Sequence, residues 1–303
     1  MTSLRRSVHI VPGSNDRMLR RALELPADAL VFDLEDSVTP DNKEAARRAV
    51  TDLLAQGSFR GQERIVRMNA LETPWAAADL EATMAGRPDA YMVPKARTPA
   101  DLAKIDSILS RLEQRYGYPD RSVKLMVIAT ETPQGLLNIK DLAVSPRLDG
   151  LTWGAEDLSA AIGARRNRDE HGGFLEVFRY ARIMTLLAAT AAGIQPLDTV
   201  FVKLRDLEGC RQECREAAGM GFTGKLTIHP SQVEIVNEIF SPSAAEVAEA
   251  EQLVAAFEEN RRAGRMAFAF NGEMVDAPHL ERARRILDIA SRISRKGEPK
   301  AIN

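Results

Sequence analysis

The sequence ALVFDLED at positions 29–36 is a short apolar run followed by a segment with three acidic residues, Asp33, Glu35 and Asp36. A near-continuous apolar run of this length is typical of a parallel strand that is buried on both faces. Residues 43–54 follow it with their apolar positions at helical spacing. Together the two segments predict a strand–helix unit whose strand carries carboxylates at its carboxyl end.

The same unit repeats along the chain. Seven more apolar runs are predicted to be strands, at residues 8–11, 64–68, 90–93, 124–128, 150–153, 199–202 and 226–228. Further helices are predicted at residues 17–25, 75–84, 99–116, 133–142, 174–192 and 207–220. This alternation indicates a parallel sheet with right-handed crossovers, and eight units favour a closed (β/α)₈ TIM barrel over an open doubly wound sheet. No GxGxxG pattern follows the first run, which argues against dinucleotide binding.

The chain is longer than a plain barrel requires. It has 303 residues, whereas a (β/α)₈ barrel typically needs about 250. Beyond the eighth run we predict helices at residues 233–240 and 244–262, a hairpin-like segment at 267–276 around Asn271-Gly272, and a final helix at 278–293. The predicted domains are therefore a barrel at residues 1–240 and a C-terminal helical extension at residues 241–303.

The composition excludes several classes of protein. Lys and Arg number 41 against 43 Asp and Glu, a formal net charge of −2, which argues against a nucleic-acid binder with a basic surface. No stretch approaches the roughly 18 apolar residues of a membrane span. The two cysteines exclude a disulfide framework, and no signal-peptide pattern is evident. We therefore expect a cytoplasmic protein that binds neither nucleic acid nor membranes.

Polar side chains gather where the predicted strands end. In a (β/α)₈ barrel the chemistry takes place at the carboxyl ends of the strands, which we call the mouth. The residues that follow the runs are Asp33, Glu35, Asp36, Arg67, Asn69, Pro94, Lys95, Glu131, Gly154, Ala155, Glu156, Asp157, Lys203 and His229. The sequence therefore predicts a mouth that is rich in both carboxylates and cations.

These carboxylates suggest a metal site. Acids that lie close together cannot all ionise unless a cation is present. Glu131 and Asp157 follow adjacent predicted strands, so both side chains can reach one ion. One or two carboxylates, completed by water and substrate oxygens, describe a Mg²⁺ site, with Mn²⁺ as an alternative. The competing interpretation, strongest for Asp33 and Asp36, is that the acids favour the N-termini of the following helices.

A series of motifs along the chain resembles a known family. In order, they are VPGSNDRML, DALVFDLEDSV followed by Lys43 and Arg47, RMN, PK, ETPQG, GAEDL, LDTVF and GFTGKLTIHPSQ. This series resembles the citrate lyase β-subunit-like branch of the HpcH/HpaI aldolase superfamily, which includes malyl-CoA and citramalyl-CoA lyases. The resemblance extends from about residue 7 to residue 293. It implies a (β/α)₈ barrel, a divalent metal and a homotrimer or homohexamer.

The resemblance also implies roles for individual residues at the mouth. Glu131 of ETPQG and Asp157 of GAEDL resemble the metal ligands, and Arg67 of RMN resembles the substrate-binding arginine. The turn at Gly154, Ala155, Glu156 and Asp157 resembles the segment whose backbone N–H groups hold the carboxylate of a keto acid. Glu35, Asp36 and Lys95 would support these groups.

Two further segments acquire roles in the same way. Arg17, Arg20 and Arg21 resemble the basic residues that meet the phosphates of CoA. Asp276 of GEMVDAPHL resembles a catalytic acid/base that reaches the active site of a neighbouring subunit. Asp276 also precedes Pro278, so it can instead be an ordinary acid at the start of a helix.

The activity that the resemblance implies is a carbon–carbon lyase. It would cleave a 3-hydroxy-3-carboxy acyl-CoA of the malyl-CoA, citramalyl-CoA or citryl-CoA type to acetyl-CoA and a 2-keto acid. Three alternatives stay open: a metal-dependent aldolase that does not use CoA, a thioesterase or malate-synthase-type activity, and an inactive barrel subunit. A Schiff-base aldolase that uses Lys95 is a further alternative, but the predicted pair of metal ligands argues against it.

Overall fold

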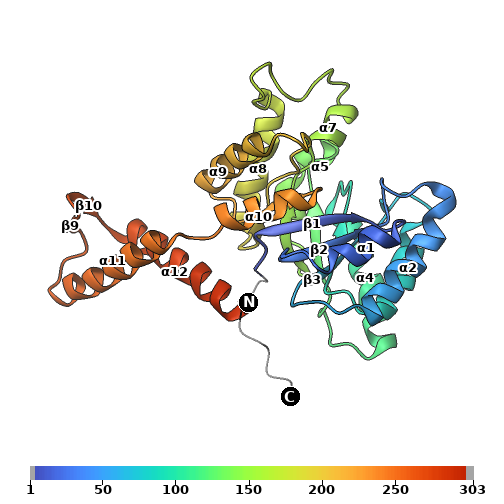
Figure 1. The fold of residues 1–303 in the computed structure, drawn as a ribbon, viewed down its shortest axis with the longest axis horizontal. Coiled ribbons are helices and arrows are strands. Elements are labelled where there is room, and N and C mark those ends of the chain that lie inside the picture. Colours follow the sequence, from blue (N-terminus) through green and yellow to red (C-terminus); the bar gives the residue numbers. More distant parts are fainter. Residues whose placement is uncertain (1–3, 298–303) are drawn as a thin grey trace. The chain divides into compact units, whose positions relative to one another are not determined.

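The computed structural model describes residues 4–297 and contains an eight-stranded parallel sheet (Figure 1). Its strands are β1 Ser7–Pro12, β2 Ala29–Asp33, β3 Glu63–Arg67, β4 Ala90–Val93, β5 Lys124–Ile128, β6 Leu148–Thr152, β7 Gln195–Pro196 and β8 Lys225–Thr227. They pair in the order β7-β6-β5-β4-β3-β2-β1-β8, and an isolated parallel bridge between Asp198 and Lys225 joins the two ends of that order. The predicted (β/α)₈ fold is confirmed.

The helices follow the strands in the expected alternation, with one further helix at residues 155–161 that the sequence pattern did not predict. They are α1 Asp16–Ala22, α2 Lys43–Gln56, α3 Ala76–Thr83, α4 Pro99–Tyr116, α5 Pro133–Leu137, α6 Ile139–Leu142, α7 Ala155–Ala161, α8 Glu176–Ala191, α9 Leu207–Met220 and α10 Pro230–Ile239. Short 3₁₀ turns lie at Pro40–Asn42 and Met84–Gly86. Local signals explain the boundaries: α4 begins with a capping box between Thr98 and Asp101 and ends at Gly117, which has a φ of 69°.

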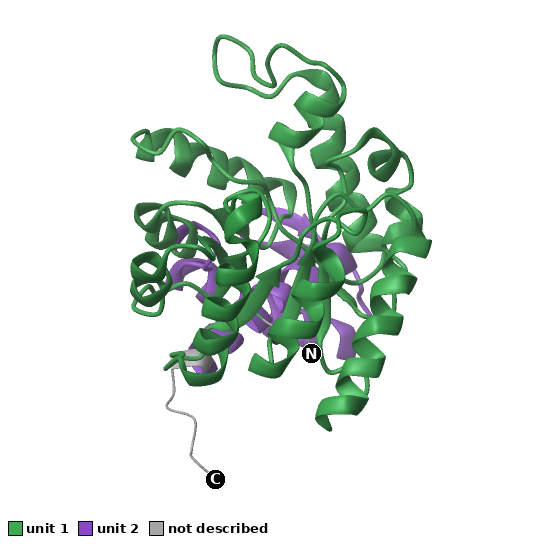
Figure 2. Ribbon diagram, turned by 90° about the vertical axis from the view of Figure 1, so that its right-hand side faces the viewer, with its two compact units in different colours: residues 1–237 green, residues 238–303 purple. Residues whose placement is uncertain are grey.

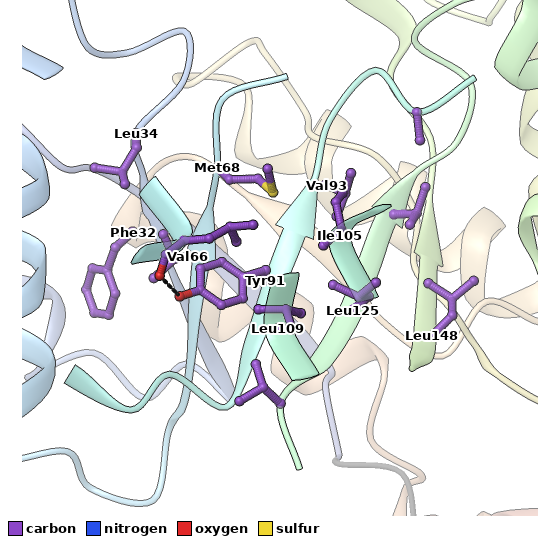
Figure 3. Packing of buried hydrophobic residues seen from close by; sticks show 14 of the residues in the cluster. Phe32, Leu34, Val66, Met68, Tyr91, Val93, Ile105, Leu109, Leu125 and Leu148 are labelled. Atoms are coloured by element: carbon purple, nitrogen blue, oxygen red, sulfur yellow. Dashed lines mark hydrogen bonds between the residues drawn. The ribbon is translucent and has the colours of Figure 1, made fainter. Parts of the chain in front are cut away.

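The strands bury both of their faces, as their apolar runs predict. One set of side chains, which includes Val31, Ile65 and Met126, forms a separate buried cluster. The alternate residues, such as Phe32 and Tyr91, pack with residues of the surrounding helices (Figure 3). Because side chains alternate along a strand, Asp33 and Arg67 at the strand ends lie on the same face as Val31 and Ile65. The fold therefore directs these two charged residues to the interior side of the mouth.

The seventh strand differs from the prediction. Residues 199–202 are not a strand; β7 lies at Gln195–Pro196, where it pairs with Gly150 and Leu151 of β6. This short strand consists of a glutamine and a proline, so it is not an apolar run and the sequence pattern does not predict it. The apolar segment that follows it lies outside the sheet, where the Phe201 carbonyl accepts a hydrogen bond from Gln232 Nε2 at 2.8 Å.

One predicted helix is divided in two. The helix predicted at residues 133–142 consists of α5 and α6, which meet at Asn138. The Asn138 side chain donates a 2.9 Å hydrogen bond to the Arg97 carbonyl, which lies in the loop after β4. This contact ties the break in the helix to the mouth.

The chain divides into two compact units, residues 1–237 and residues 238–303 (Figure 2). The described part of the second unit consists of α11 Ala244–Arg262, β9 Phe268–Phe270, β10 Glu273–Val275 and α12 Ala277–Gly297. Strands β9 and β10 are antiparallel, and Asn271 and Gly272 between them both have a positive φ, as a tight hairpin turn requires. The helices and the hairpin that the sequence predicts here are confirmed. No helix in residues 4–297 is long and apolar enough to span a membrane.

Candidate active site at the mouth of the barrel

The loop after β2 begins with a buried aspartate. Asp33 is the last residue of β2, and its two carboxylate oxygens accept backbone hydrogen bonds from Glu35 at 2.9 Å and from Ser37 at 3.1 Å. Such bonds let an Asp side chain close a turn upon its own backbone. The turn brings Glu35 to a buried position and leaves Asp36 exposed.

Arg67 lies opposite Asp33 because β2 and β3 pair in register at these two residues. Its Nε and Nη2 donate to the two oxygens of Asp33 at 2.6 and 2.7 Å, and its Nη1 lies 3.3 Å from Glu35 Oε2. Such a bidentate pair fixes the plane of the guanidinium as well as its position. Burial alone would raise the pKa of Asp33. The charge and hydrogen bonds of Arg67 have the larger effect and hold that pKa below its usual value.

Lys95 is the centre of the acidic cluster. Its Nζ lies 2.6 Å from Glu35, 3.4 Å from Asp36 and 3.3 Å from Asp157, while its backbone N–H donates to Glu131 Oε2 at 2.7 Å. Its φ of 53° lies in the left-handed region. Burial alone would lower the pKa of Lys95, but Glu35 and the other acids raise it. A lysine that stays protonated is a poor nucleophile, so these contacts disfavour a Schiff base.

Glu131 follows β5 and is 3% exposed. A Cβ on Gly154 would lie 2.7 Å from Glu131 Cγ, so only glycine leaves room for this carboxylate. The Gly154 N–H donates to Thr130 Oγ1 at 3.2 Å, which connects the ends of β5 and β6. Burial, followed by the charges of Glu35 and Asp157, raises the pKa of Glu131 to about 8. The mouth therefore holds more carboxylates than its own cations neutralise.

Helix α7 begins directly after Gly154 and carries Glu156 and Asp157 in its first turn. Acidic residues are favourable at this end of a helix dipole. The exposed Glu156 accepts a 2.8 Å hydrogen bond from Asn167 Nδ2, in the loop that follows α7. Asp157 instead approaches Lys95. The structure thus brings together seven residues, which we call the mouth cluster: Asp33, Glu35, Asp36, Arg67, Lys95, Glu131 and Asp157.

The donor set of the mouth cluster fits a hard cation. No group of three or more His, Cys, Asp or Glu residues that could hold a metal ion occurs among the described residues. Glu131 and Asp157 both approach Lys95, and the charge of Asp157 lies close enough to raise the pKa of Glu131. Two carboxylates with open positions for water and substrate oxygens suit Mg²⁺, which is usually bound through one or two protein carboxylates.

The remaining predicted residues lie outside the mouth cluster. Arg17, Arg20 and Arg21 are exposed on α1, which begins shortly after β1 and is capped by the Asn15 side chain. Asp276 belongs to the second unit, where it directly precedes α12 and its Oδ1 lies 2.7 Å from Nδ1 of His279.

Two features escaped the sequence analysis. The first is the role of Asp33 as the bidentate partner of Arg67, which depends on the register of β2 with β3. The second is a buried network behind β6 and β8, in which Asp198 accepts hydrogen bonds from Trp153, Arg182 and Lys225 at 2.8 to 3.0 Å. The available signal for this network is Lys225, which directly precedes the strand predicted at residues 226–228, because a buried lysine requires an acidic partner.

Comparisons with known proteins agree with this architecture. The family described as HpcH/HpaI aldolase/citrate lyase matches residues 6–230. A (3S)-malyl-CoA thioesterase of Cereibacter sphaeroides is 39% identical, over 95% of each chain. The mitochondrial citramalyl-CoA lyase of Rattus norvegicus is 35% identical over 96% of this chain and 88% of its own, and the citrate lyase subunit beta of Escherichia coli K12 is 38% identical over 95% and 94%.

Solved structures give the same result. The CitE protein of Mycobacterium tuberculosis, in complex with magnesium, acetoacetate and coenzyme A, has a TM-score of 0.77 and 34% identity, over 94% of this chain and 97% of its own. These matches confirm the resemblance predicted from the sequence motifs and, with it, an enzyme of lyase type.

Proposed function

The chain belongs to the HpcH/HpaI aldolase/citrate lyase family, and on this premise we propose that it is a Mg²⁺-dependent carbon–carbon lyase acting on an acyl-CoA. The substrate would be a 3-hydroxy-3-carboxy acyl-CoA, and the products acetyl-CoA and a 2-keto acid. The observation that carries the proposal is the mouth cluster, where Glu131 and Asp157 both contact Lys95 and Glu35 connects Lys95 to Arg67.

Glu131 and Asp157 are the residues that would hold Mg²⁺. Bound there, the cation would lower the pKa of the substrate hydroxyl. The absence of a side chain at Gly154 gives Glu131 its place, and Lys95 fixes it through a backbone hydrogen bond. The turn from Gly154 to Asp157 opens α7 with backbone N–H groups that would bind the keto-acid carboxylate.

Arg67 would stabilise the charge that develops during cleavage. The substrate hydroxyl would release its proton to solvent water and become a carbonyl as the bond between the hydroxyl carbon and the carbon next to the thioester breaks, and the electron pair of that bond would move to the thioester enolate. The guanidinium is held in place by Asp33 and keeps its charge. Loss of one such electrostatic contact typically lowers turnover by about 10²–10³-fold.

Asp276 would complete the reaction by donating a proton to the enolate carbon, and it would act as the base in the condensing direction. In this proposal Asp276 reaches the mouth of a neighbouring subunit, so the enzyme is a homotrimer or homohexamer. The exposed Arg17, Arg20 and Arg21 would pair with the phosphates of CoA. A cytoplasmic location and a tolerance for Mn²⁺ belong to the same proposal.

Hydrolysis of the thioester is the second candidate function. It is favoured by the relatives named (3S)-malyl-CoA thioesterase, at up to 39% identity over nearly the whole chain. The same mouth could bind the malyl group for either reaction, so the distinction requires product analysis.

A panel of malyl-CoA, citramalyl-CoA and citryl-CoA, together with the corresponding free hydroxy acids, tests these functions. Each compound is incubated with Mg²⁺ and with EDTA. A lyase releases a 2-keto acid together with acetyl-CoA, and EDTA abolishes the reaction. Free CoA without a keto acid would establish the thioesterase instead. Keto-acid release that EDTA leaves unchanged would refute the metal site. Cleavage of the free hydroxy acids would establish an aldolase that does not need CoA, and no reaction with any compound would favour an inactive subunit.

A further inference from the structure

Lys43 is a buried cation that the proposed reaction does not use. It is the first residue of α2 and is 5% exposed. Its Nζ donates hydrogen bonds to the backbone carbonyls of Leu34 and Glu35, both at 2.7 Å, and lies 5.2 Å from the centre of the Trp75 ring. Burying an ammonium without a carboxylate partner is unfavourable, so its two short bonds to the backbone require an explanation.

The two carbonyls belong to the loop that carries the acids of the mouth. Leu34 and Glu35 directly follow Asp33, the partner of Arg67, and the Glu35 side chain contacts both Arg67 and Lys95. Fixing these two peptide groups therefore fixes the positions of the carboxylates on either side of them.

The same point also connects to the loop after β3. The Leu34 carbonyl accepts a second hydrogen bond from Asn69 Nδ2 at 2.9 Å, and Asn69 in turn donates to Asp79 from both its backbone and its side chain. Arg47, one turn of helix beyond Lys43, donates to the other oxygen of Asp79 at 2.7 Å. Through Lys43 and Arg47, helix α2 thereby connects the loop after β2 to the segment after β3.

We propose that Lys43 is a positioning residue, whose buried ammonium fixes the loop that carries Asp33 and Glu35 and thereby aims Arg67 into the mouth. Lys43 contacts the mouth cluster only through the backbone carbonyl of Glu35, so it acts on Arg67 through this loop. It also places a third positive charge behind a cluster with five carboxylates and two cations. This inference rests on the proposed function, because Arg67 is the group that it positions.

The test is Lys43→Met, which keeps the length and most of the volume of the side chain but removes the charge and the donors. We expect kcat on the best CoA thioester to fall by about 10–100-fold, because a misplacement of about 1 Å can lower the rate by 10²-fold. We expect KM to change by less than threefold, since the CoA-binding residues lie elsewhere. Lys43→Arg keeps the charge and the donors, so its kcat should be at least fivefold higher than that of Lys43→Met.

The control is Arg48→Met on the same helix, where the arginine side chain is 70% exposed and pairs with Glu44 on the helix surface. It should keep kcat within twofold of the wild type. If Lys43→Met does not fold, Lys43→Gln carries the same expectation, because it lacks the charge and is too short to span both carbonyls. A folded variant of either kind with kcat within twofold of the wild type overturns the proposal, as does Lys43→Arg with no gain.

A crystal structure of the Lys43→Met protein separates this inference from the proposed function. We expect the loop at residues 34–38 to shift and the two short bonds between Arg67 and Asp33 to lengthen or break. If the wild type cleaves no thioester, the proposed function fails, but an unchanged Arg67–Asp33 pair in this crystal structure still refutes the role of Lys43.

Discussion

Replacing Gly154 by alanine is the sharpest test of the mouth geometry. The new Cβ would lie 2.7 Å from Glu131 Cγ, and this separation must open to at least 3.4 Å for ordinary van der Waals contact. Glu131 has little freedom to move, because it is 3% exposed and its Oε2 is bonded to the Lys95 backbone. The backbone at residue 154 is tied to Thr130 in the same way.

The expected result is a selective loss of metal binding and turnover. Displacing a proposed Mg²⁺ ligand by the better part of an ångström should lower kcat by about 10²-fold and weaken Mg²⁺ binding in a calorimetric titration. Overpacking of this kind should also lower the free energy of unfolding by about 1–3 kcal/mol, measured by urea denaturation.

The matched control is Gly219→Ala. Gly219 lies in α9, and a Cβ there would meet no atom within 4 Å. Alanine in a helix should stabilise the protein by about 0.5–1 kcal/mol and leave turnover unchanged. If Gly154→Ala binds Mg²⁺ and turns over as the wild type does, the close approach of Gly154 to Glu131 has no part in the site.

Three further predictions follow from individual residues. Glu131→Gln should abolish Mg²⁺ binding by calorimetry while the fold persists by circular dichroism; an unchanged Mg²⁺ affinity would remove Glu131 from the metal site. Asp276→Ala should lower turnover by at least 10²-fold but leave Mg²⁺ affinity nearly intact, and near wild-type activity would rule out its acid/base role. Lys225 and Arg182 hold the pKa of Asp198 below its usual value, against the effect of burial. The ionised Asp198 therefore stabilises the fold fully above the unfolded pKa of about 4, and this stabilisation is lost as the pH falls through the lower folded pKa. Asp198→Asn should therefore be less stable at pH 7 and lose less of its Tm between pH 5 and pH 3 than the wild type, and parallel Tm curves would contradict this.

The barrel could be predicted because its signals are local. Apolar runs and helical spacing mark each strand and helix, and the parallel arrangement brings all carboxyl ends of the strands to one face. Residues as far apart as Arg67 and Asp157 could thus be placed at one mouth before any contact was known. The one missing strand, Gln195–Pro196, is two residues long, and half of it is a proline. A strand so short has no periodicity to detect.

The sequence by itself determined most of the order of the elements, except for the position of β7 and the helix α7, together with the hairpin at Asn271-Gly272 and the set of charged residues at the mouth. Each of these depends on neighbours within a few positions of the chain. Only the tertiary structure decided which of those charges pair. The bond between Asp33 and Arg67 depends on the register of two strands, and the space for Glu131 depends on a glycine more than twenty residues away in sequence. Such distances are set by packing across the whole barrel, which no local pattern encodes.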